Sequence, residues 1–154
     1  MNIFILDNDP VKAAQMLCGK HVVKMCLETA QMLSTINGGP YKPTHANHPC
    51  TVWARQTLGN FRWLVEHGIA IGDEYLHRYG KEHKSTEVIF GCKGFIPNHD
   101  ETLTPFALAM PDEFKVEDPV ESYRNYYMSK QSFCNWTKRD IPEWFLERLE
   151  LANV

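Results

Sequence analysis

The chain has 154 residues, 44% of them hydrophobic and 23% charged, which describes one folded domain and excludes a disordered protein. Its 16 basic and 19 acidic side chains give a net charge of −3, and this excludes a protein that coats nucleic acid through bulk charge alone. Basic side chains outnumber acidic ones within residues 1–99, so a polyanionic ligand is expected to bind there.

The beginning of the chain predicts an extended segment followed by a short helix. Residues 2–6 are mostly β-branched or aromatic, which favours extended backbone. The stretch from Asp7 to Pro10 is a helix-start signal, so a short helix is expected over residues 11–17. The apolar run is too short for a signal peptide, and a cytoplasmic location is therefore expected.

The rest of the chain is predicted to be mainly helical. A helix over residues 20–36 should end at Asn37-Gly38-Gly39-Pro40. Between Cys50 and Tyr79, apolar residues recur every three or four positions and predict one long helix, or two helices joined near Gly59-Asn60. Further helices are expected over 86–92, 120–130 and 142–151, with residues 93–119 mostly loop and one or two helical turns near 106–110. The predicted fold class is mainly α, a compact single domain over residues 1–154 with long loops.

The five cysteines are scattered and contain no Cys-x-x-Cys pair. This pattern favours reduced, buried thiols over a disulfide framework or a structural zinc site. No apolar stretch approaches the length of a membrane span, so no membrane contact is expected.

A polar stripe runs along the otherwise apolar helix predicted over residues 20–36. His21, Lys24, Glu28 and Gln31 follow a spacing that places them within one face of the helix. Charged groups on a core helix must be paired or used, because an unpaired buried charge is costly. On spacing alone we favour ion pairing over chemistry. The partners offered by the next long helix are Arg55, Arg62, Glu74 and Arg78.

Other polar residues give weaker signals. His45 and His48 lie in a proline-rich loop that could bind metal, contact phosphate or face solvent. Glu74 and His77 have the Glu-x-x-His spacing of di-iron bundles, but only one copy is present, so no metal is expected. His67 and His77 are predicted to face solvent. Residues 130–139 mix aromatic and basic side chains, and packing on the domain is favoured over a nucleic-acid surface.

The order of three motifs resembles the phage-type pyrimidine-dimer DNA glycosylase/AP-lyase family, the endonuclease V repair enzymes. These motifs are Leu17-Cys-Gly-Lys-His21 followed by Glu28, the His-led helical stretch from His48 to Gly80, and the Tyr-rich stretch from Tyr123 to Lys130. The resemblance covers residues 1–130 and leaves 131–154 as a C-terminal extension.

The resemblance implies a glycosylase in which the terminal amine attacks the sugar, displaces the base and leaves an imine. Met1 would carry this nucleophile and Glu28 would act as acid, base and charge stabiliser. Asn2 is not small, so Met1 is expected to be retained. Lys24, once desolvated, is a second candidate amine.

The resemblance also implies the ligand. The expected substrate is DNA with a damaged or modified pyrimidine, in a duplex that is distorted or has a flipped base. No cofactor is expected, and the protein is expected to be a monomer in the cytoplasm, of an infected host cell if a bacteriophage encodes it. The residues expected to contact substrate are His21, Lys20, Asn2, His45, His48, Arg55 and Arg78.

Two other functions fit the residues. One is a metal-dependent hydrolase or nuclease, with ligands drawn from His21, Glu28, His45, His48 and Glu74. The other is a non-catalytic phage accessory protein that binds a partner, in which the polar stripe is structural.

Overall fold

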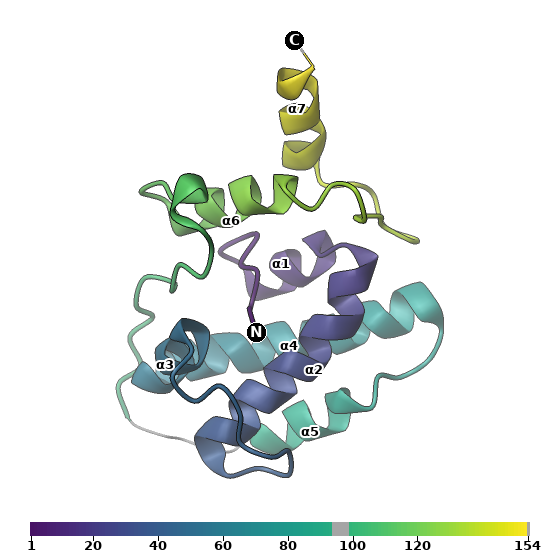
Figure 1. Ribbon diagram of the computed structural model, residues 1–154. Coiled ribbons are helices and arrows are strands. Elements are labelled where there is room, and N and C mark those ends of the chain that lie inside the picture. The colour runs from purple at the N-terminus through teal and green to yellow at the C-terminus, as the bar shows by residue number, and fades with distance from the viewer. Residues whose placement is uncertain (94–98, 154) are drawn as a thin grey trace.

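The computed structural model describes residues 1–93 and 99–153, and within them the protein is built from helices without a β-strand (Figure 1). The predicted mainly α fold is confirmed. The helices are α1 (Pro10–Met16), α2 (Gly19–Asn37), α3 (Pro49–Gln56), α4 (Leu58–Tyr79), α5 (Ser85–Cys92), the short 3-10 helix η1 (Asp112–Phe114), α6 (Pro119–Met128) and α7 (Glu143–Ala152).

Helix α2 occupies the centre of the domain and packs against α3, α4 and α5. It ends where the sequence predicts, because Gly38 adopts a left-handed conformation, with φ of 73°, that closes the last turn. One edge of α2 is less buried than its apolar sequence suggests, since Val23 and Leu27 are exposed. The helix therefore has an open side along which polar groups can meet a ligand.

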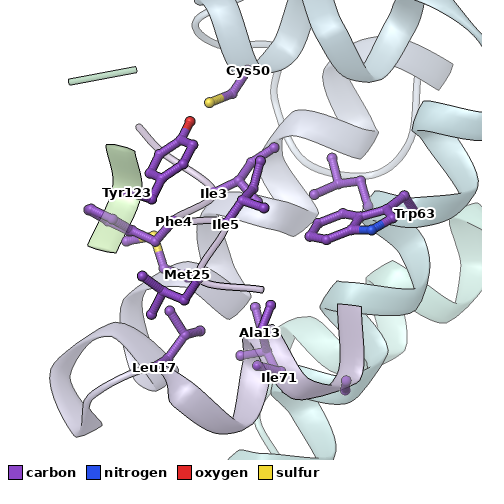
Figure 2. Close-up of a cluster of buried hydrophobic side chains, with 14 of the residues drawn as sticks. Ile3, Phe4, Ile5, Ala13, Leu17, Met25, Cys50, Trp63, Ile71 and Tyr123 are labelled. Atoms are coloured by element: carbon purple, nitrogen blue, oxygen red, sulfur yellow. The ribbon is translucent and has the colours of Figure 1, made fainter. Parts of the chain in front are cut away.

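The extended N-terminal segment lies inside the domain, as its apolar sequence predicts (Figure 1). Ile3 and Ile5 are almost fully buried, and Figure 2 shows them between Trp63 of α4 and Tyr123 of α6. Burying one such side chain contributes about 1.5–3 kcal/mol. The start of the chain is thus fixed by the core.

Several boundaries and environments differ from the prediction. The break between α3 and α4 falls at Thr57, whose hydroxyl accepts the amide N–H of Asn60 and caps α4, whereas the sequence predicted a joint near Gly59-Asn60. Residues 106–110 are not helical, and the short helical turn of this loop lies at η1. His67 was predicted to face solvent but is fully buried. Residues 94–98 of the predicted loop lie outside the described residues.

The end of the chain crosses back over the beginning of α2. The amide of Gly19 donates to the carbonyl of Asn135 at 2.7 Å, and the Trp136 indole donates to the carbonyl of Met16 at 2.9 Å. Beyond this crossing, α7 projects away from the other helices and rests on α6 (Figure 1). The segment from 129 to 139 is therefore positioned to form one wall of whatever site lies at the start of α2.

Candidate active site

The beginning of the chain is bound to the buried glutamate of α2. The terminal amine of Met1 lies 3.0 Å from Oε1 of Glu28, and the amide of Asn2 donates to the same oxygen at 3.1 Å. The other carboxylate oxygen, Oε2, is buried and has no hydrogen-bond partner within the described residues. One oxygen of this carboxylate holds the amine, and the other is buried without a hydrogen-bond partner among the described residues.

This arrangement differs from the ion pairing that the spacing of α2 favoured. Glu28 pairs with the terminal amine rather than with an arginine of the long helix. On α4, Glu74 instead accepts hydrogen bonds from Arg78 and Arg139, each at 2.8 Å. Although burial alone would raise it, the bonds from Arg139 and Arg78 lower the pKa of Glu74.

Glu28 and the amine lie in a pocket of about 360 Å³. Its polar lining is cationic, because Lys20, Lys24 and Lys130 border it. The remainder is mostly aromatic, with Phe133 beneath the ammonium of Lys20 at 4.9 Å and Tyr126 beneath that of Lys130 at 4.3 Å. Lysines suit an anionic ligand, and aromatic faces suit the flat rings of bases.

His21 is buried in the wall of this pocket. Its ring stacks on Phe4, with centroids 4.3 Å apart and planes inclined by 13°. Its Nδ1 hydrogen-bonds the hydroxyl of Tyr127 at 2.7 Å, and that hydroxyl also accepts the amide N–H of Cys18 at 3.0 Å. The imidazole is therefore held in a fixed orientation at the first turn of α2.

The proline-rich loop before α3 carries His45 and His48, and neither lines the lysine pocket. His48 caps α3, with Nδ1 accepting the amide N–H of Cys50, and this bond fixes the neutral ring as a donor through Nε2. Burial lowers the pKa of His48, and the positive N-terminus and His45 lower it further, whereas Glu28 opposes them. The predicted contacts of His45 and His48 with substrate therefore stay predictions.

Two of the arginines predicted to contact substrate have structural partners. Arg55 donates to the carbonyl of Ala46 at 3.1 Å and so supports the loop that carries the histidines. Arg78 is only 2% exposed, pairs with Glu74 and donates to the carbonyl of Gln15, so it does not line the lysine pocket. The structure gives Arg78 a structural role between α1 and α4 instead of a place in this pocket, and its predicted contact with substrate has no support from this geometry.

A larger pocket, of about 780 Å³, lies between α1 and α4 but has the opposite electrostatic character. Four carboxylates border it, against one arginine that is already bound to Glu74. A phosphate backbone would be repelled there. The acidic residues are Asp9, Glu66, Asp73 and Glu74.

The ligand set of the alternative metal enzyme is not assembled. Within residues 1–93 and 99–153, no group of three or more histidine, cysteine or acidic side chains is arranged to hold a metal ion. His21 is committed to Tyr127, Glu28 to the terminal amine, and Glu74 to two arginines. This geometry gives no support to metal-dependent hydrolysis through these side chains.

The sequence prediction of site residues did not include Phe4, Tyr126, Lys130 or Phe133, although all four line the pocket. The Tyr-rich motif was the available signal for Tyr126 and Lys130, and the mixed aromatic and basic pattern of residues 130–139, for which packing on the domain was favoured, was the signal for Phe133. Phe4 gave none, because its position depends on a left-handed backbone, with φ of 55°, that no local pattern predicts.

The pocket places an amine, which can act as a nucleophile, next to a carboxylate that can accept its proton. The comparison with known families agrees, because a model of the pyrimidine dimer DNA glycosylase family matches residues 1–87. This match spans more than half of the 154 residues, and the chain belongs to that family. No curated protein and no solved structure matches this chain.

Family membership carries a DNA glycosylase-like repair function and DNA binding. Separately, no helix within the described part of the chain is both long and apolar enough to cross a membrane.

Proposed function

We propose that this protein is a DNA glycosylase with AP-lyase activity, in which the terminal amine of Met1 is the nucleophile and Glu28 is the acid and base. One observation carries the proposal: the amine lies 3.0 Å from a buried carboxylate, inside a pocket bordered by three lysines. Geometry of this kind prepares a reacting pair before substrate arrives.

The amine acts first. Its contact with Oε1 of Glu28 supplies an acceptor for the proton that the ammonium must lose before it attacks. The free amine forms a bond to C1′ of the sugar, and the C1′–base bond breaks with its electron pair leaving on the base. Opening of the sugar ring then gives an imine between Met1 and C1′.

Glu28 serves the later steps with the proton that it took from the ammonium. Its protonated carboxyl can donate that proton to the ring oxygen of the sugar, which gains negative charge as the ring opens. Loss of a C2′ proton from the imine then breaks the C3′–O bond by β-elimination. Hydrolysis of the imine returns the amine.

The remaining pocket residues bind rather than react. Lys20, Lys24 and Lys130 neutralise phosphates beside the lesion, and the rings of Tyr126 and Phe133 face a base. A pocket of about 360 Å³ takes a nucleotide only after it leaves the stack, so we propose that the protein acts on duplex DNA with a distorted or flipped base. We also propose that it acts as a monomer.

Borohydride trapping tests the covalent step. Reduction of the imine should join the protein permanently to DNA that contains an abasic site or a pyrimidine dimer, and peptide mass spectrometry should locate the adduct on Met1. An adduct on Lys24 would transfer the nucleophile to that side chain. Absence of any adduct, with base release intact, would exclude amine catalysis.

Substitution of the carboxylate tests the second role. Glu28→Gln keeps the size of the side chain and removes its charge, so strand cleavage should fall at least about 100-fold while the helical circular dichroism is retained. Glu87→Gln, an exposed change on α5, is the matched control and should keep full activity. Activity that survives Glu28→Gln but is lost on chelation would instead favour a metal-dependent enzyme.

A further inference from the structure

The side chain of Asn2 was predicted to contact substrate, yet the structure uses it within the chain. Asn2 is 8% exposed. Its Oδ1 accepts the amide N–H groups of Ile3, at 2.8 Å, and of Phe4, at 3.0 Å. Its Nδ2 donates to the carbonyl of Ala109 at 2.8 Å. One carboxamide therefore makes three hydrogen bonds around the first turn of the chain.

These bonds stabilise an unusual backbone. Phe4 has φ of 55°, a left-handed conformation that costs a residue with a side chain about 1–2 kcal/mol. Acceptance of two successive amides by Oδ1 is the Asx-type bonding that favours such a turn. The turn directs the Phe4 ring onto His21 and leaves the amide of Asn2 pointing at Glu28.

The bond to Ala109 ties this turn to the opposite side of the domain. Ala109 belongs to the loop before η1, and its amide N–H donates a hydrogen bond to the hydroxyl of Tyr123, at 3.3 Å. The same hydroxyl donates to the carbonyl of Ala107. The anchor of Asn2 is thus itself fixed to α6, so the carboxamide links the chain start to a rigid element.

We infer that Asn2 is a positioning residue whose carboxamide aims the terminal amine at the reacting carbon, and this inference rests on the proposed function. Only one residue, Met1, joins the amine to the backbone of Asn2, so any movement of the Asn2 backbone displaces the nucleophile. A misplacement of about 1 Å is enough to slow a reaction about 100-fold. Binding of DNA depends on the lysines and should be unaffected.

Asn2→Leu tests this inference, because leucine has a similar size and cannot form the three bonds. A large residue at position 2 also keeps the initiator methionine, which intact mass will verify. Single-turnover imine trapping should slow 10- to 100-fold, with the dissociation constant for abasic DNA within about twofold of the original. Hydrogen exchange of the Ile3 and Phe4 amides should accelerate at least about tenfold.

Two companion variants sharpen the result. Asn2→Asp keeps an acceptor for both amides but loses the donor to Ala109, so its trapping rate should lie between those of the original protein and Asn2→Leu. Asn8→Leu, an exposed change in the following turn, should match the original protein in every measurement.

The possible failures are distinguishable. Trapping by Asn2→Leu at the original rate, even with faster amide exchange, overturns the positioning role and leaves the amine chemistry intact. Absence of trapping in the unaltered protein overturns the proposed function itself. A fall in DNA affinity that accounts for the whole loss of rate would return Asn2 to substrate binding and also overturn the inference.

Discussion

Replacing His67 by glutamine is expected to remove a large part of this protein's sensitivity to mild acid. His67 is fully buried on α4, against the ring of Trp63, and its Nδ1 hydrogen-bonds the carbonyl of Pro10 at 2.9 Å. Burial lowers the pKa of this histidine from 6.5 to about 4, because a charged ring would have to be desolvated. The folded protein therefore holds His67 neutral at pH 5, whereas the unfolded chain protonates it.

The sign and size of the effect follow from that difference. Since the unfolded state binds the extra proton, stability is lost as pH falls below 6.5, and the loss stops near pH 4 where the folded state also titrates. A shift of this size corresponds to about 3 kcal/mol in full, of which about 2 kcal/mol appears between pH 7 and pH 5.

Urea unfolding followed by tryptophan fluorescence at pH 7, 6 and 5 measures this quantity directly. Glutamine cannot take up a proton in this range and retains a donor for the carbonyl of Pro10. The free energy of unfolding of His67→Gln should therefore change much less with pH, whatever its absolute value. His99→Gln, at an exposed position, should keep the original dependence. Equal slopes in His67→Gln and the unaltered protein would refute the reasoning.

Three further predictions concern charge. Lys24→Ala should reduce the slope of log affinity for DNA against log salt by about 1, measured by fluorescence anisotropy, whereas Lys81→Ala should not change it. Arg139→Gln should lower the free energy of unfolding by about 1 kcal/mol at pH 7, since Glu74 keeps its bond to Arg78. Because the pKa of Glu74 is lowered, its ion pairs stabilise the fold above pH 4.5, so denaturation midpoints of Arg139→Gln and the original should converge as pH falls below that value.

Local signals in the sequence predicted most of the helices. Gly38 marks the end of α2, and the Asp9-Pro10 pair marks the start of α1. Each favours the backbone conformation or hydrogen bonds that a helix end requires, and does so within a single turn. The spacing of His21 and Glu28 likewise placed both on one face of α2. Local chemistry of this kind is visible without knowledge of the rest of the fold.

The partners of these residues could not be predicted in the same way. Glu28 binds an amine 27 positions earlier in the chain, and Phe133 reaches His21 from more than a hundred positions later. Such contacts depend on how helices pack, and spacing within one helix carries no information about them. For the same reason the sequence offered Arg78 as a ligand contact, although packing against α1 had already enclosed it.

Because the end of the chain crosses over α2, two separate parts of the sequence build the proposed active site. The amine and carboxylate come from the first 28 residues, inside the matched family region, whereas Tyr126, Lys130 and Phe133 lie beyond it. Evolution can therefore remodel the wall that meets a base without disturbing the reacting pair. Chimaeras that exchange the last third of the chain between relatives should inherit their lesion preference from the donor of that third, and their chemistry from the other parent.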